Sequence, residues 1–240
     1  MKVFMFDVDG TLTPSRQQMV RQFDNFFFQW GHRNTFYLVS GSDLEKMKEQ
    51  VPEHTLELAS GLFCCGGNQF YVNDKLVYEN KFKVPQTLLT YLGLQVRLSD
   101  SPVMSTNHRE DRGSMLNFSV VGRNCTQKER EQYFEWDKKV GERKKIAQEI
   151  MEGWPELDAV IGGQISIDIV PKGFDKSQIL EHIEKIENAD EYIFYGDRIE
   201  EGGNDYPLAQ MLENRTDGKV HKVNDWQDTL EQLRNNKYWV

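Results

Sequence analysis

The pattern of apolar and polar residues predicts a chain that begins as an alternating strand and helix fold. Residues 3–6 (VFMF) are continuously apolar, which is typical of a strand buried on both faces. Apolar residues recur at helical spacing over 19–30, residues 35–39 predict a second buried strand, and 44–51 again show helical spacing. Strands that alternate with helices in this way indicate a parallel sheet with helical crossovers.

Residues 83–170 show a different pattern, mostly antiparallel strands with one long helix. Thr126 and Glu129 form a capping box that predicts the start of this helix, and Ser42 with Glu45 predicts the start of the helix over 44–51. In the segment 165–170, isoleucines alternate with Ser166, Asp168 and Val170, so Ser166 and Asp168 are expected on one face of a strand.

The alternating rhythm returns after Pro171. Helical spacing covers 179–186, with Lys176 expected to open this helix, and residues 192–195 predict a buried strand that ends at Gly196 and Asp197. The last helix includes 226–233 and is capped at Asn224 or Asp225. We therefore expect an α/β protein whose parallel-sheet core is built from both ends of the chain, with a second domain inserted as a possible lid. The predicted division is 1–82, 83–171 and 172–240.

Composition and charge limit the classes of function. A net charge of -9 and a pI of about 5.2 argue against nucleic acid as the main partner. Apolar runs stay well short of the roughly 20 residues that span a bilayer, and the N-terminal run breaks at Asp7, unlike a signal peptide. Three cysteines without a secretion signal favour buried, reduced thiols in a cytosol-like compartment.

Polar residues follow the ends of the predicted parallel strands. Asp7 and Asp9 follow the first strand, Ser40 the second and Asp197 the strand over 192–195, while Lys176 comes soon after Pro171. In open parallel sheets, ligands bind beyond the carboxyl ends of the strands. Carboxylates, a hydroxyl and an ammonium gathered there would bind Mg²⁺ and a phosphate together, and a carboxylate can attack phosphorus directly.

Other interpretations of the DVDGT stretch fit less well. A calcium loop has glycine sixth and glutamate twelfth, whereas Gly10 is fourth here and Gln18 twelfth. A simple turn would explain Asp9 and Gly10 alone, and no Walker Gly-x-x-x-x-Gly-Lys is present. The combination of the carboxylates with the later serine, lysine and aspartate favours phosphoryl transfer.

These residues also carry a family resemblance. DVDGTLT, a strand that ends in serine, a lysine and GDRIEEGGND together resemble the haloacid dehalogenase (HAD) phosphotransferase superfamily. The similarity is closer to one branch, the eukaryotic-type phosphomannomutases, and covers nearly the whole chain. TLTPSRQ, MLNFSVVGRNCTQKER, GGQISIDIVPKGFDK and YGDRIEEGGND all resemble that branch. The resemblance implies a Rossmann-like HAD core with an inserted α+β cap domain.

The resemblance also implies roles for the residues at the strand ends. Asp7 would be the nucleophile that becomes phosphorylated, and Asp9 the general acid and base. Mg²⁺ would be held by the side chains of Asp7 and Asp197 and by the backbone carbonyl of Asp9. Lys176 would hold the transferring phosphoryl group.

A serine is expected to share that task. The family's second motif reads Gly-Gly-Ser-Asp, whereas residues 40–43 here read Ser-Gly-Ser-Asp. Ser40 stands where a typical HAD phosphatase carries its serine, so either Ser40 or Ser42 is a candidate for the phosphate contact.

The substrate's other phosphate would be gripped by arginines, whose paired donors suit phosphate oxygens. For Arg130 alone, a solvated helix face is the preferred alternative. The positions that match the family's substrate contacts are Arg16, Arg112, Arg123, Arg130, Ser166 and Asp168.

The predicted function is a Mg²⁺-dependent phosphomannomutase that interconverts mannose 6-phosphate and mannose 1-phosphate. An aspartyl-phosphate and a hexose 1,6-bisphosphate, which also acts as activator, would be intermediates. The resemblance further implies a homodimer that associates through the cap. Cysteine usage, apolar run length and charge predict a cytoplasmic protein without membrane or nucleic-acid partners. A HAD-type sugar-phosphate phosphatase is the alternative, and a non-catalytic sugar-phosphate binder is disfavoured because a binder needs no nucleophile.

Overall fold

The computed structural model describes residues 1–235 and 238 and divides into two compact units. The core unit comprises residues 1–79, 176–201 and the described chain from 205 onward. The insert unit comprises residues 80–175 and 202–204. Each unit has its own sheet.

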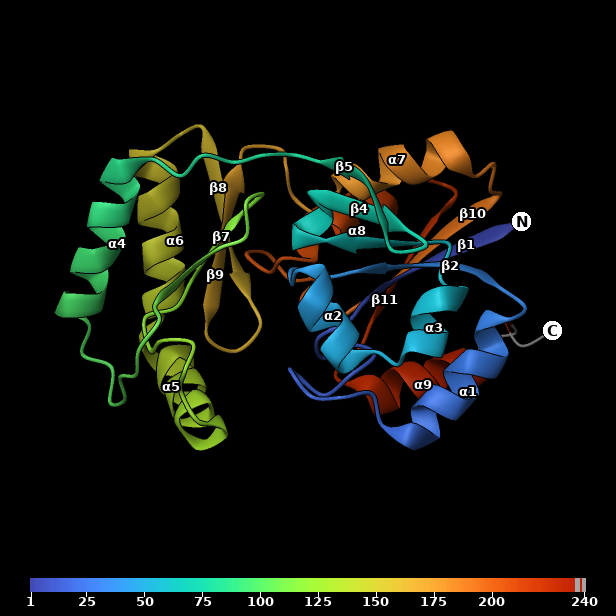
Figure 1. Cartoon of the computed structure of the whole chain (residues 1–240), viewed down its shortest axis with the longest axis horizontal. Helices are drawn as coiled ribbons and strands as arrows, with labels where there is room; N and C mark the ends of the chain where they lie inside the picture. Colours follow the sequence, from blue (N-terminus) through green and yellow to red (C-terminus); the bar gives the residue numbers. More distant parts are fainter. Residues whose placement is uncertain (236–237, 239–240) are drawn as a thin grey trace. The chain divides into compact units, whose positions relative to one another are not determined.

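The core sheet has seven strands in the order β11-β10-β1-β2-β3-β4-β5 (Figure 1). The strands from β11 to β3 are parallel, and β4 and β5 add an antiparallel edge. Both ends of the chain supply parallel strands, which confirms the predicted α/β core. The strands are β1 (Lys2–Asp7), β2 (Thr35–Val39), β3 (Gly61–Cys64), β4 (Gln69–Val72), β5 (Lys75–Glu79), β10 (Glu191–Gly196) and β11 (Gly218–Lys222).

Helices cover both faces of this sheet, which explains why β1 is continuously apolar. The rings of Phe4 and Phe6 pack edge-on against Trp30 of α1, with centroids 4.8 and 5.4 Å apart. Met5 points the other way, into a cluster with Ile183 of α7. The core helices are α1 (Arg21–Gly31), α2 (Leu44–Gln50), α3 (Glu53–Leu58), α7 (Gln178–Ile186), α8 (Tyr206–Glu213) and α9 (Trp226–Asn235), with a 3-10 turn at Cys65–Gly67.

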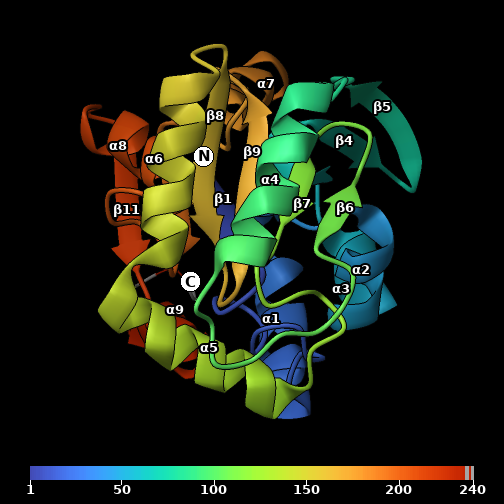
Figure 2. The ribbon, with the colours of Figure 1, turned by 90° about the vertical axis from the view of Figure 1, so that its left-hand side faces the viewer.

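The insert unit has a four-stranded antiparallel sheet in the order β6-β7-β9-β8. Helices α4 and α6 lie along one face of it (Figure 2), where Leu92 and Ile150 share a core with Ile167 and Ile169. The predicted alternation in β9 is therefore confirmed. The elements are β6 (Arg109–Asp111), β7 (Leu116–Phe118), β8 (Leu157–Gly162), β9 (Ser166–Pro171), α4 (Gln86–Leu98), α5 (Gln127–Val140) and α6 (Glu142–Gly153). None of the helices in the described residues is long and apolar enough to cross a bilayer.

Three predicted helix starts in the core unit are wrong. Asp43, not Ser42, caps α2, because its carboxylate accepts the Lys46 N–H at 3.0 Å at the positive end of the helix. Helix α7 begins at Gln178, so Lys176 precedes it rather than opening it. The backbone N–H of Met19 donates to the Gln50 carbonyl, and α1 begins only after it, at Arg21.

The prediction of one long helix in the insert is also wrong, because α4, α5 and α6 are present. The capping box of Thr126 and Glu129 is confirmed, but the helix ends at Gly141, whose φ of 72° is left-handed. Helix α7 includes Ile186 as predicted, and this residue is 57% exposed at the end of the helix. For α9, Asp225 rather than Asn224 accepts the Asp228 N–H, at 3.0 Å.

Candidate active site

A buried lysine joins two aspartates beyond the carboxyl end of β1. Lys176 Nζ lies 2.5 Å from Asp7 Oδ1 and 2.6 Å from Asp205 Oδ1. The side chains of Lys176, Asp7 and Asp205 are 2%, 5% and 0% exposed. One ammonium group thus offsets the charge of two carboxylates, since a buried charge is tolerated only when it is paired and hydrogen-bonded.

A third carboxylate, that of Asp197 after β10, completes the cluster. Oxygens of Asp7, Asp197 and Asp205 all lie within 4.8 Å of one another. Gly10 makes room for this approach, because a Cβ at that position would lie only 2.6 Å from Asp197 Oδ2. Its φ of +86° also favours glycine, so the DVDGT turn needs this residue for two reasons.

Burial, together with the neighbouring carboxylates, raises the pKa of both metal-ligand candidates. Burial raises the pKa of Asp7 well above its usual range, Lys176 lowers it in part, and Asp205 and Asp197 raise it further. Burial and the neighbouring Asp205 raise the pKa of Asp197 to about 7. Burial lowers the pKa of Lys176, but Asp205 and Asp7 outweigh this and keep it a cation. Carboxylates held this close together are poorly balanced by a single lysine.

The donor set fits a hard divalent cation. Each of these three side chains offers carboxylate oxygens, and Mg²⁺ prefers oxygen over nitrogen and sulfur. The structure brings together Asp7 and Asp197 as predicted and adds Asp205, which the sequence interpretation missed. The second aspartate of GDRIEEGGND was the signal for it. Within the described residues, the side chain of Asp9 is not part of this group.

The carboxylate of Asp9 is fixed by two donors instead. Asp9 Oδ1 accepts the backbone N–H of Arg16 at 2.8 Å and Gln50 Nε2 at 3.0 Å. Arg16 has a left-handed φ of 57°, and its hydrogen bond to Asp9 helps to hold the loop in that conformation. An oriented carboxyl group suits the proposed proton transfer, and Gln50 is a contact that the sequence did not predict.

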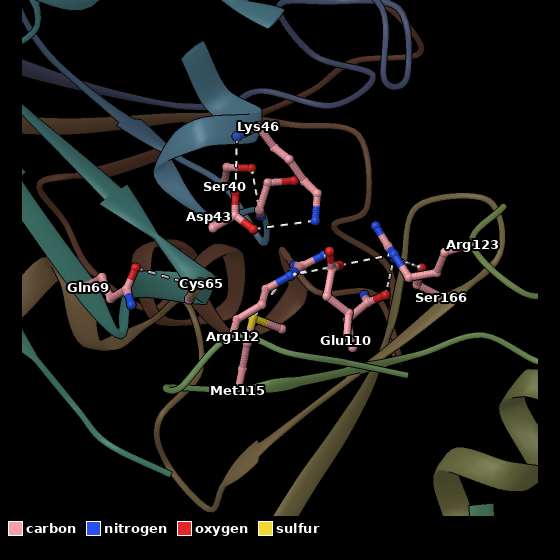
Figure 3. Close-up of polar contacts among 12 residues, drawn as sticks. Ser40, Asp43, Lys46, Cys65, Gln69, Glu110, Arg112, Met115, Arg123 and Ser166 are labelled. Carbon is pink, nitrogen blue, oxygen red and sulfur yellow. Dashed lines mark hydrogen bonds and ion pairs between the residues drawn. The ribbon is translucent and has the colours of Figure 1, made fainter. Parts of the chain in front are cut away.

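Ser40 lies buried at the end of β2, next to β1, where Asp7 pairs with Val39. Its hydroxyl oxygen accepts the Ser42 N–H at 3.0 Å, and Asp43 forms an ion pair with Lys46 (Figure 3). Ser40 and Ser42 therefore belong to one tight turn at the strand end, and both remain candidates for phosphate binding.

In the insert unit, polar residues form a row across three strands. Glu110 on β6 pairs with Asn117 on β7, which pairs with Asp168 on β9. Asn117 Nδ2 donates to Asp168 Oδ1 at 2.5 Å, and Asn117 Oδ1 accepts from Arg123 Nη1. Arg123 Nη1 also lies 3.4 Å from Ser166 Oγ. Three predicted substrate residues are thus linked on one face of the sheet.

Two of the predicted arginines share one acid. Glu110 Oε2 lies 2.7 Å from Arg112 Nη2 and 3.0 Å from Arg123 Nε (Figure 3). Arg130, in the first turn of α5, is only 5% exposed. The prediction that it lies on a solvated helix face is therefore wrong. Glu110 and Asn117 were missed, although Asn117 alternates with the apolar residues of β7.

Comparison with known proteins places this geometry in context. The eukaryotic phosphomannomutase family model matches residues 23–237. The chain is 38% identical to the phosphomannomutase of Encephalitozoon cuniculi, over 86% of this chain and 83% of that protein. It is 32% identical to a probable phosphomannomutase of Caenorhabditis elegans, over 97% and 94%. Its fold resembles that of the HAD subclass IIB sugar phosphatase BT4131, with a TM-score of 0.61 at 13% identity, over 99% and 100% of the two chains.

The buried lysine generates a prediction about stability. Lys176→Met leaves Asp7 and Asp205 buried without their counter-charge, so in metal-free buffer it should lower the free energy of unfolding by about 3–5 kcal/mol. Urea denaturation followed by circular dichroism measures this. Lys185→Met, which removes an exposed pair with Glu181, is the control and should cost at most about 0.5 kcal/mol. Adding Asp205→Asn to Lys176→Met should restore part of the loss; a single variant as stable as the control would contradict this account.

Proposed function

The chain belongs to the eukaryotic phosphomannomutase family, and from this premise we propose that it interconverts mannose 6-phosphate and mannose 1-phosphate. The observation that carries the proposal is the buried Asp7, which Lys176 contacts at 2.5 Å and which lies beside Asp197 and Asp205 at a strand end. A protein that only binds sugar phosphates needs no nucleophile, and therefore needs no buried carboxylate beside both a lysine and a cation site.

In the first half-reaction, a carboxylate oxygen of Asp7 attacks phosphorus of the bisphosphate intermediate. The new oxygen–phosphorus bond forms as the bond from phosphorus to the sugar oxygen breaks. Asp9 donates its proton to that leaving oxygen, which becomes the hydroxyl of the sugar monophosphate. The hydrogen bonds from Arg16 and Gln50 to one oxygen of Asp9 orient its carboxyl group for this transfer.

The second half-reaction reverses the roles with the other isomer. Asp9 takes the proton from the hydroxyl of an incoming sugar monophosphate, whose oxygen then attacks the phosphoryl group on Asp7. The bond from Asp7 to phosphorus breaks, and a hexose 1,6-bisphosphate forms again. Because either phosphate can be transferred, a small amount of the bisphosphate primes the enzyme.

The residues that would hold Mg²⁺ are Asp7, Asp197 and the backbone carbonyl of Asp9, with Asp205 close by. When bound, Mg²⁺ would neutralise charge on the transferring phosphoryl group. Lys176 and either Ser40 or Ser42 would contact the same group. The raised pKa of Asp197 supports a cation partner, because it reflects a carboxylate that burial and its neighbours leave short of positive charge.

The other phosphate of the substrate would bind to arginines. Arg112 and Arg123 have side chains that are only 4% exposed, and hydrogen bonds fix their guanidinium groups, which supports a built anion site. Arg16, Arg130, Ser166 and Asp168 would complete the substrate contacts. The cytoplasmic location and the homodimer stay predictions.

The mutase activity can be tested directly. Mannose 1-phosphate with Mg²⁺ and a catalytic amount of glucose 1,6-bisphosphate should give mannose 6-phosphate with little free phosphate, followed in one ³¹P time course. Asp7→Asn should abolish conversion, since its amide is no nucleophile, and Asp9→Asn should slow it by on the order of 10²–10⁴-fold. Stoichiometric phosphate release that is unaffected by bisphosphate would instead identify a phosphatase.

Removing the metal should have two separate effects. EDTA should stop turnover and Mg²⁺ should restore it, while Zn²⁺ should restore it less well because all the ligands are oxygens. Mg²⁺ should also raise the melting temperature of the substrate-free protein, since a cation relieves the repulsion among its carboxylates. Asp197→Asn should weaken that shift. Full activity after thorough chelation would contradict the proposal.

A further inference from the structure

A single carboxylate oxygen, from Glu110 in the insert's polar row, accepts hydrogen bonds from both Arg112 and Arg123. Glu110 Oε2 accepts from Arg112 Nη2 at 2.7 Å, from Arg112 Nε at 3.2 Å and from Arg123 Nε at 3.0 Å. Figure 3 shows the two guanidinium groups directed at this one acid. Glu110 itself is 25% exposed, so it lies at the margin of the cluster rather than within it.

The contacts of Glu110 occupy the arginine edges that a phosphate would use. Nε and Nη2 of Arg112 form a paired edge of the kind that grips phosphate oxygens, and Glu110 takes both donors. Arg112 Nη1 donates to the thioether of Met115 at 3.9 Å, which is a weak acceptor. A phosphate that binds these arginines must therefore share them with a carboxylate that is part of the protein.

The rest of the network holds Arg123 from its other side. Its Nη1 donates to Asn117 and lies close to Ser166, so its orientation does not depend on Glu110 alone. Glu110 thus contributes two separable things to the site: an acceptor oxygen and a negative charge.

We propose that Glu110 is a built-in counter-ion that lowers the affinity of Arg112 and Arg123 for the phosphate that they bind. This rests on the proposed function, in which these arginines hold the phosphate that is not being transferred. Two nearly buried guanidinium groups without a counter-charge would hold a dianion very tightly, since electrostatic attraction is strong where water is excluded. The charge of Glu110 reduces that attraction.

A weakened grip suits a mutase. The phosphate that the arginines bind must dissociate from them before it can itself be transferred to Asp7. The product must also dissociate from the enzyme. Glu110 therefore sets a compromise between holding and releasing the remote phosphate, and it does so without touching the reacting atoms.

Glu110→Gln separates the two contributions, because the amide oxygen still accepts hydrogen bonds while the charge is lost. Binding of glucose 1,6-bisphosphate to the full-length protein, measured by calorimetry, should become tighter by about tenfold. The KM for mannose 1-phosphate should fall as well. A residue with a merely structural role would give the opposite result, since loosening the site weakens binding.

Asp111→Asn is a matched control. Asp111 is the next residue on β6, it is exposed, and its carboxylate accepts the Gly113 N–H at 2.9 Å. The change in net charge and shape is the same, so bisphosphate affinity should stay within about twofold. Glu110→Ala, which also removes the acceptor, should bind the bisphosphate less tightly than Glu110→Gln.

The outcomes distinguish this inference from the proposed function. Suppose that the wild-type protein is shown to be a mutase. If Glu110→Gln then binds the bisphosphate no more tightly than the wild type does, the inference about Glu110 is overturned and the proposed function still stands. A wild-type protein that binds bisphosphate but only releases phosphate would refute the mutase assignment, and the comparison of Glu110→Gln with wild type would still decide the role of Glu110. A wild-type protein that binds no bisphosphate would overturn both.

Discussion

The ammonium group of Lys176 is the charge on which the candidate active site depends. It lies between Asp7 and Asp205, both almost fully buried, and a third carboxylate from Asp197 lies within the same cluster. Without a cation, carboxylates so close together would repel one another or take up protons. The fold supplies this cation from a part of the chain 169 residues after Asp7, just where the sequence returns from the insert to the core.

In both units, a group of like charges is partly neutralised by one residue of the opposite charge. In the core unit a lysine partly neutralises a cluster of carboxylates, and in the insert unit Glu110 partly neutralises a pair of arginines. Three carboxylates lie around one lysine in the first cluster, and two arginines contact one glutamate in the second. In the proposed function a divalent cation would bind the first cluster and a phosphate the second, and phosphoryl transfer from a sugar phosphate needs both.

The sequence predicted the parts of the structure that follow from local pattern. The continuous apolar run of β1, the alternation in β9 and the capping box at Thr126 each report burial or hydrogen bonding within a few residues. The missed contacts mostly join residues that are distant in sequence, or they bind a predicted site residue instead of a substrate. They are made by Asp205, Glu110, Asn117 and Gln50. Helices α4 and α6 were missed because neither begins with a side-chain cap, although Leu88 and Leu92 in α4 and Ile146 and Ile150 in α6 recur at helical spacing.

The central claim is that Asp7 carries the phosphoryl group during the reaction. The direct measurement is acid quenching of the protein within the first turnover with glucose 1,6-bisphosphate and Mg²⁺, followed by mass spectrometry of its peptides. The account predicts one phosphoryl group on the peptide that contains Asp7, and none on that peptide in Asp7→Asn. A phosphoryl group on another residue, or turnover with no phosphorylated intermediate under conditions that preserve aspartyl-phosphate, would contradict it.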